Sequence, residues 1–223
     1  MHSGVYQFSE SSVWQILLQS FRNPAAIAPG DGYVLFSLRL PRIVMAILMG
    51  SALAVSGTCL QGMFKNPLAT PSLIGITSGA SLFAAVAIVL GAGLKAFLPE
   101  VMQYSLISVM AFLGAIITMT IVYRISNTNG KTNIVIMLLA GVAISALAGA
   151  VTGFLTYLTK EEQLRDLTFW TLGSLGGASW IKNGILAVVV TVSFILLINK
   201  GKALNGMMLG EKDAAHLGIP VEN

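Results

Sequence analysis

The sequence predicts an all-α, polytopic transmembrane helical bundle. Of its 223 residues, 55% are hydrophobic and only 10% are charged, and the mean hydropathy is +0.81. A soluble domain carries about 25% charged residues. The uncharged stretches are continuously apolar rather than alternating, which indicates helices and not barrel strands. These observations exclude a soluble globular protein.

Five uncharged stretches define the predicted membrane helices. The gaps between successive charged residues that bound them are 22, 29, 23, 28 and 17 residues long. A helix needs about 20 apolar residues to cross a bilayer. The predicted spans are therefore residues 42–62, 72–94, 102–124, 133–157 and 181–199.

The two ends of the chain lead us to expect a fragment of a longer protein. Residues 1–41 hold one short apolar piece, 13–21, which is too short to span a membrane and is not a signal-peptide core. The C-terminus is equally abrupt. Five spans place the two ends on opposite sides, and the basic residues are too evenly distributed for the positive-inside rule to orient them.

The first predicted span lies between two polar features. Arg39 and Arg42 precede it, and their simplest role is to anchor the helix at the membrane interface. Asn66 and Leu68 follow it in an Asn-Pro-Leu-Ala sequence, which favours a turn. On the residues alone, this segment is an ordinary turn between two helices.

Small residues recur every four positions along the fourth predicted span. They are Gly141, Ser145, Gly149 and Gly153. Small side chains at this spacing let helix backbones approach closely. This face either packs against a neighbouring helix or lines a conduit, and both roles are compatible with one helix.

The loops between the later spans contain two further features. Residues 160–166 carry mixed charges and are predicted to form a solvated loop, with a protein contact as the alternative. Trp170 and Trp180 are expected to anchor at the interface. Residues 210–218 are predicted to form a short surface helix with acidic residues in its first turn.

Several classes of function are disfavoured. Apart from Arg42, Arg124 and Lys182 at their ends, the predicted spans contain no charged residue, which argues against an ion-coupled carrier or a pump. His2 and His216 have no metal-ligand spacing, and Cys59 is the single cysteine, so we expect no bound metal or cofactor. Nothing resembles a basic surface for nucleic acid.

Six motifs occur in a fixed order over essentially the whole chain. They are residues 39–42, 50–57 with Gln61, 66–75, 139–143, 169–175 with Trp180, and 209–218. In these motifs the chain resembles the FecCD-type permeases of bacterial ABC importers. That family carries iron–siderophore complexes, haem or cobalamin across the cell inner membrane.

The resemblance implies a type II importer permease that works as a pair of subunits with ten spans each. The five predicted spans would be helices two to six, so residues 1–41 would lie outside and residues 209–219 in the cytoplasm. The chain would not be an enzyme, because ATP hydrolysis would occur on separate cytoplasmic ABC ATPase subunits. A periplasmic or lipid-anchored substrate-binding protein and a second permease subunit would be its other partners.

The resemblance also assigns roles to residues. Arg39 and Arg42 would pair with glutamates of the substrate-binding protein, and Asn66 and Leu68 would help close the cytoplasmic gate. The small residues from Gly141 to Gly153 would lie beside the translocation pathway. Contact with the ATPase would fall to Gly210, Glu211, Asp213, Ala214, Ala215, Leu217 and Gly218.

An iron–siderophore complex is the cargo expected first, and haem and cobalamin are the alternatives. Nothing in the residues separates the three chelates. Two other classes remain open: an ATP-independent channel or carrier, and an inactive, truncated permease remnant.

Overall fold

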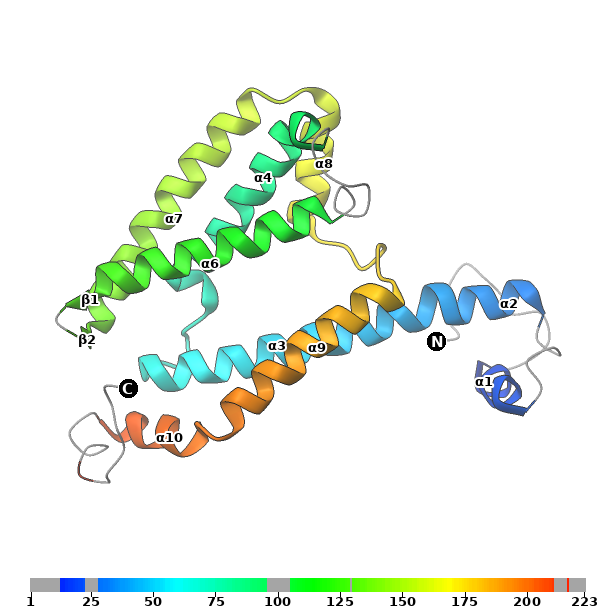
Figure 1. Cartoon of the computed structure of the whole chain (residues 1–223), viewed down its shortest axis with the longest axis horizontal. Helices are drawn as coiled ribbons and strands as arrows, with labels where there is room; N and C mark the ends of the chain where they lie inside the picture. The colour runs from blue at the N-terminus through cyan, green and yellow to red at the C-terminus, as the bar shows by residue number, and fades with distance from the viewer. Residues whose placement is uncertain (1–12, 23–27, 96–104, 129, 211–215, 217–223) are drawn as a thin grey trace. The chain divides into compact units, whose positions relative to one another are not determined.

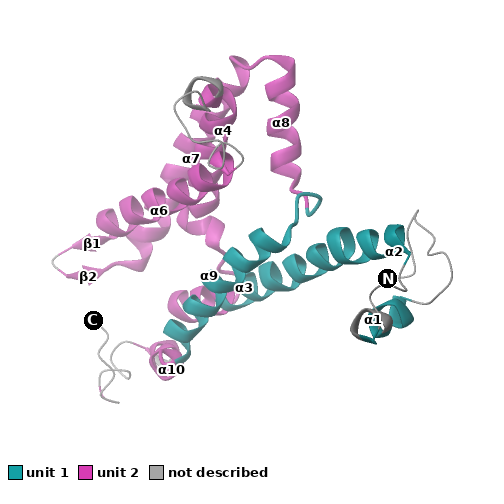
Figure 2. Cartoon of the chain, turned by 45° about the vertical axis from the view of Figure 1, so that its right-hand side comes forward, with its two compact units in different colours: residues 1–55, 175–198 teal, residues 56–174, 199–223 magenta. Residues whose placement is uncertain are grey.

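The computed structural model describes residues 13–22, 28–95, 105–128, 130–210 and 216 (Figure 1). The chain divides into two compact units, residues 1–55 with 175–198 and residues 56–174 with 199–223 (Figure 2). The described residues are almost entirely helical, apart from loops and one short strand pair. The predicted all-α class is confirmed.

The first unit consists of one long helical run, formed by α2 (Pro29–Tyr33), the π-helix η2 (Val34–Arg39) and the first part of α3 (Leu40–Phe64), and of the two helices α1 (Val13–Arg22) and α9 (Trp180–Ile198). Val13 and Ile16 of α1 are buried against Leu35 of η2, so the short apolar piece covers this turn.

The helix that was predicted to begin at the two arginines begins earlier. The helical run extends from Pro29 to Phe64 without a break, and proline is favourable in a first turn. Arg39 and Arg42 therefore lie inside the run. A charge marks where the apolar part begins, but it does not end a helix. The 22 uncharged residues after Arg42 extend for about 33 Å, which matches a hydrocarbon layer of about 30 Å.

The second unit contains the remaining elements and a helical bundle. They are the last part of α3, the 3₁₀-helix η3 (Pro71–Ile74), α4 (Ile76–Lys95), α6 (Leu106–Ser126), β1 (Asn127–Thr128), β2 (Lys131–Thr132), α7 (Ile134–Tyr157), α8 (Glu161–Leu172) and α10 (Gly201–Leu209). Helices α4, α6 and α7 pack against one another, and the two strands form an antiparallel hairpin between α6 and α7 (Figure 1).

Glycines allow the backbones of this bundle to approach closely. A Cβ added to Gly79 of α4 would overlap Thr118 of α6, and one added to Gly114 of α6 would overlap Phe83 of α4. Small residues at helix crossings are typical of membrane bundles, where dispersion contacts rather than water exclusion hold helices together.

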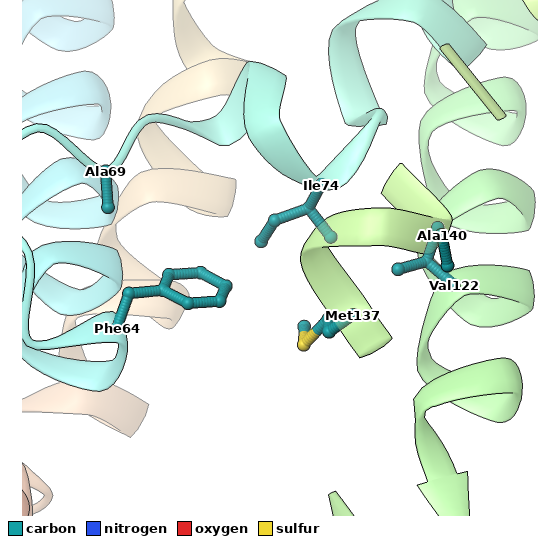
Figure 3. Packing of buried hydrophobic residues seen from close by; sticks show 6 residues of the cluster. All are labelled: Phe64, Ala69, Ile74, Val122, Met137 and Ala140. Carbon is teal, nitrogen blue, oxygen red and sulfur yellow. The ribbon is translucent and has the colours of Figure 1, made fainter. Parts of the chain in front are cut away.

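An apolar cluster connects the end of α3 to the bundle within the second unit. Its buried members are Phe64, Ala69, Ile74, Val122, Met137 and Ala140 (Figure 3). They come from α3, the turn after it, η3, α6 and α7. The turn that follows α3 is thus fixed by packing on its inner side.

Four of the described helices are long and apolar enough to cross a membrane. They are Pro29–Phe64, Leu106–Ser126, Ile134–Tyr157 and Trp180–Ile198. The second predicted span is helical as well, but its apolar stretch is shorter, Ile76–Gly91. It begins later than predicted because η3 and the left-handed Gly75 (φ 78°) precede it.

The predicted mixed-charge loop at residues 160–166 is instead mostly helical. Most of it forms the first half of α8. The backbone N–H of Lys160 donates to Gln163 Oε1 at 3.2 Å, which satisfies one exposed donor at the helix start. Glu161 and Glu162 lie in the first turn, where the helix dipole favours acids. The Gln163 amide also donates to the carbonyl of Val89 at 3.0 Å, so α8 is tied to α4.

Candidate functional site

The two arginines lie on either side of a change in helix type. Arg39 is the last residue of the π-helix η2 and is half-buried, whereas Arg42 lies in the first turn of α3 and is exposed. Pro41 stands between them and is almost completely buried. A proline inside a helix lacks an N–H and clashes with the preceding turn. The wider π turn just before Pro41 accommodates this residue.

The π turn leaves one carbonyl without a backbone donor. In a π-helix the carbonyl of residue i accepts from the N–H of residue i+5, and Leu40 N–H accordingly donates to the carbonyl of Leu35. The corresponding donor for Phe36 would be Pro41, which has no N–H. A side chain takes its place, because the indole N–H of Trp180 donates to the Phe36 carbonyl at 2.9 Å.

A second side chain of α9 contacts the same stretch of helix. Asn183, one turn after Trp180, is 3% exposed and donates from Nδ2 to the carbonyl of Pro41 at 2.8 Å. Its Oδ1 is buried and has no hydrogen-bond partner among the described residues. An unsatisfied buried acceptor costs about 1–3 kcal/mol. The hydrogen bond from Asn183 Nδ2 to the Pro41 carbonyl is therefore the contribution of this side chain to the site.

The turn after α3 is a complete helix C-cap. The N–H of Asn66 donates to the Gln61 carbonyl at 3.1 Å and that of Lys65 to the Gly62 carbonyl at 3.3 Å. These are the two hydrogen bonds of a Schellman motif. Lys65 occupies the left-handed position, with φ 51°.

The two predicted gate residues have different positions in this turn. Asn66 Oδ1 accepts from the backbone N–H of Leu68 at 2.9 Å, which closes an Asx-turn. The side chain of Leu68 is 80% exposed, while the next residue, Ala69, is buried in the apolar cluster. Asn66 thus shapes a fixed turn from which Leu68 projects.

The face of small residues along α7 divides into two parts. Gly141 is buried, and a Cβ there would overlap the carbonyl oxygen of Leu73. Ser145 Oγ is buried without a hydrogen-bond partner among the described residues, and a Cβ on Gly75 would lie 3.3 Å from it. Gly149 and Gly153 are exposed, with nothing within 4 Å of an added Cβ. Only the first half of this face packs within the described chain.

The predicted ATPase-contacting segment falls largely outside the described residues. That is the case for Glu211, Asp213, Ala214, Ala215, Leu217 and Gly218. Gly210 is described: it ends α10, with φ 128° and its N–H donating to Met207 at 3.2 Å.

Helix α10 lies beside the end of α3 within the second unit. A Cβ added to the buried Gly62 would be 3.9 Å from Leu204 Cδ2 and 4.0 Å from Met208 Cγ. Gly210 and the turn at residues 65–69 are therefore at the same end of α3. Among the described residues, no group of three or more His, Cys, Asp or Glu side chains could hold a metal ion.

Sequence reasoning did not find the role of Asn183 and saw Trp180 only as an interface anchor. Pro41 was the available signal. This proline stands just before the predicted span but inside the observed helical run from Pro29 to Phe64, where it leaves a carbonyl without a donor, so a donor is needed elsewhere. The Trp-x-x-Asn spacing at the start of α9 places two such donors on one face.

The model of the FecCD transport family matches this chain over residues 1–223. The chain belongs to the FecCD transport family. The resemblance noted in the six sequence motifs is thereby confirmed, and the chain is a multi-pass protein of the cell inner membrane.

Two curated relatives are similar in sequence to this chain. The chain is 41% identical to the hemin transport system permease protein HmuU of Yersinia pestis, covering 85% of this chain and 55% of that one. It is 38% identical to the cobalamin import system permease protein BtuC of Halobacterium salinarum, covering 83% and 48%. The chain thus spans about half the length of these relatives.

A solved structure shares the fold. It is described as an inward-facing conformation of a metal-chelate type ABC transporter, and it matches with a TM-score of 0.74 and 31% sequence identity. The match covers 88% of this chain and 60% of that one. The described FecCD helices therefore follow the arrangement of an ABC transporter membrane chain.

Proposed function

We propose that this chain acts as part of the permease subunit of an ABC importer for a large metal chelate. Membership of the FecCD family is the observation that supports it most. The chain would provide the passage and break no covalent bond. Nucleotide hydrolysis would occur on cytoplasmic ATPase subunits, and a substrate-binding protein would deliver the cargo.

The two ends of α3 carry features that suit this role. At one end, the exposed guanidinium of Arg42 lies next to the half-buried Arg39, and carboxylates of a docking protein would form charge-assisted hydrogen bonds with such groups. The other end carries the rigid turn from which Leu68 projects. We propose docking at the arginines and gating at Asn66 and Leu68.

The contact between α10 and Gly62 supports a coupling role for the segment after it. Residues 210–218 would bind the ATPase, and α10 would pass their movement to the end of α3, next to the gate turn. The α10 side chains that pack at Gly62 are Leu204 and Met208. Helix α10, Gly62 and the turn at residues 65–69 belong to one compact unit, which supports this proposal.

Haem is the first cargo to test. The hemin permease relative is 41% identical and the cobalamin permease relative 38%. The iron–siderophore complex, which the family resemblance led us to expect first, stays as a further candidate. The three cargoes are all large chelates, so one assay with parallel substrates separates them.

The experiment is uptake into proteoliposomes that contain the full-length protein with its ATPase and substrate-binding protein. Labelled haem, cobalamin and a ferric siderophore are compared with and without ATP. We expect ATP-dependent uptake of haem, reduced at least about tenfold by Arg39→Glu with Arg42→Glu, because reversal replaces attraction by repulsion at the docking surface.

A matched pair of basic residues provides the control. Lys160 and Arg165 of the α8 region are both exposed, and reversing them to Glu makes the same change in net charge. Uptake should remain within about twofold in that variant. Equal loss in both variants would refute docking at Arg39 and Arg42. Uptake of none of the three chelates by the assembled complex would refute the importer proposal.

A further inference from the structure

Two other helices contact the π turn η2 and the residues directly after it. Val13 and Ile16 of α1 pack against Leu35. Trp180 of α9 donates to the carbonyl that Pro41 leaves without a donor, and Asn183 donates to the carbonyl of Pro41 itself. Both donors come from the first turn of α9. Helix α9 thus supplies the hydrogen bonds that this turn lacks.

This turn sets the direction of the arginine pair. A π turn contains one residue more than an α turn, and each residue of an α-helix adds about 100° of rotation. If η2 relaxed to α geometry, the residues before the turn would rotate by up to about 100° relative to α3, and Arg39, at the end of the turn, would shift by a smaller angle relative to Arg42. A docking contact made by both guanidinium groups would then be weakened, because their relative positions would no longer match the same carboxylates.

We propose that Trp180 and Asn183 are positioning residues that hold η2 in its π form and so fix Arg39 relative to Arg42 for docking. This inference rests on the proposed docking role of the arginines. The indole N–H is the more specific of the two donors, because the carbonyl of Phe36 has no backbone donor in the π turn.

The first measurement reads the turn itself and does not depend on docking. Hydrogen–deuterium exchange is followed for peptides that cover residues 34–42 of the assembled protein in lipid nanodiscs. Trp180→Phe keeps an aromatic ring and removes the donor, so we expect exchange there to accelerate about tenfold, the equivalent of one lost hydrogen bond. Trp14→Phe is the matched control, because Trp14 is 70% exposed on α1.

A second substitution tests whether the indole acts as a donor. Pro41→Ala restores an N–H at position 41, which can serve the carbonyls of the turn directly. In the Trp180→Phe background it should return the exchange rate to within about twofold of the unsubstituted protein. If protection is not restored, the indole acts through packing alone and the inference is overturned.

The docking measurement connects the turn to the arginines. The Kd of the substrate-binding protein is measured on the same nanodiscs. Trp180→Phe and Asn183→Leu should each weaken docking about five- to tenfold, and neither should weaken it further in an Arg42→Ala background, because they act through the same contact. Equal weakening in both backgrounds would show an independent effect and overturn the inference.

The outcomes separate this inference from the proposed function. If charge reversal at the arginines abolishes docking while Trp180→Phe raises exchange and leaves docking unchanged, positioning is wrong and docking at the arginines holds. If charge reversal leaves docking unchanged, the docking role itself is wrong, whatever the exchange data show. Unchanged exchange in Trp180→Phe would show that the indole does not stabilise η2, and it would overturn the inference.

Discussion

Lys65 has a backbone conformation that lysine rarely adopts. Its φ of 51° lies in the left-handed region, where a side chain costs about 1–2 kcal/mol relative to glycine. The Schellman hydrogen bonds of Lys65 and Asn66, together with the buried Ala69, hold it there. The turn next to the proposed gate is thus a strained point that its surroundings stabilise.

Lys65→Gly should therefore stabilise the protein. We expect an increase of about 1 kcal/mol, because glycine has no Cβ to strain at this φ and loses only part of the gain through its more flexible unfolded state. Thermal unfolding of the detergent-solubilised protein measures it. Lys65→Ala is the control: it removes the long side chain, keeps the Cβ, and should leave the stability within about 0.5 kcal/mol. A gain from alanine as large as that from glycine would contradict the strain.

At the residue scale, the sequence predicted local turns better than hydrogen bonds between residues that are far apart in the chain. The Asn-Pro-Leu-Ala turn was foreseen because a short polar side chain before proline specifies a turn by itself. The pairing of Trp180 with Phe36 joins residues 144 positions apart, so no local rule indicates it. The missing N–H of Pro41 calls for a donor, but it does not say which residue supplies it.

At the element scale, α7 shows why a repeated small-residue pattern has no single meaning. Gly141 faces η3, where its missing side chain admits the backbone of Leu73. Gly149, two turns further along the same face, contacts no described residue in this way. The sequence spacing was the same at both positions, and the neighbouring elements decide the role of each.

Gly141→Ala and Gly149→Ala form a matched pair on this helix. Alanine at position 141 must displace the backbone of η3, so we expect a loss of about 1–3 kcal/mol in unfolding free energy. Alanine at position 149 enters open space and should be neutral or stabilise by up to about 1 kcal/mol through helix propensity. Chemical unfolding in detergent measures both. Equal effects would contradict the division of this face.

Element boundaries were predicted less well than element types. The run from Pro29 to Phe64 begins well before its apolar part, because a helix that starts at a favourable N-terminal proline continues through the charged residues that precede the apolar stretch. Helix α8 was predicted as a loop because charge was taken as a sign of irregular structure. Its capping glutamine and acidic first turn are start signals that composition alone conceals.

At the scale of the whole molecule, the helices of the second unit determine which segments face the same side of a membrane. Helix α7 is a 24-residue apolar helix between the β1–β2 hairpin and α8. If it crosses the bilayer, the hairpin and α8 lie on opposite sides. The family resemblance puts the hairpin on the cytoplasmic side.

Cysteine labelling can test this arrangement directly. Cys59 is the single cysteine of these 223 residues, so Cys59→Ala, combined with removal of every cysteine elsewhere in the full-length protein, gives a background for Lys131→Cys in the hairpin and Glu162→Cys in α8. A membrane-impermeant maleimide added to intact spheroplasts should label position 162 and should label position 131 only after permeabilisation. Labelling of both positions from one side would contradict a membrane-spanning α7.

The class of the molecule was the part most accessible to prediction. Low charge and long apolar runs determine a helical membrane protein because the bilayer leaves few other ways to satisfy backbone hydrogen bonds. The choice of cargo depends on the shape and polarity of a passage to which several helices contribute. No single motif in the chain specifies it.

The proline at position 41 also makes the substitutions tolerated at positions 41 and 180 depend on each other. Because Pro41 removes a donor that Trp180 supplies, a protein that loses the proline no longer needs the indole, and one that keeps it cannot easily replace Trp180. Substitutions at these two sites are then expected to arise as compensating pairs. A helix with a missing hydrogen bond can in this way constrain the evolution of the helix beside it.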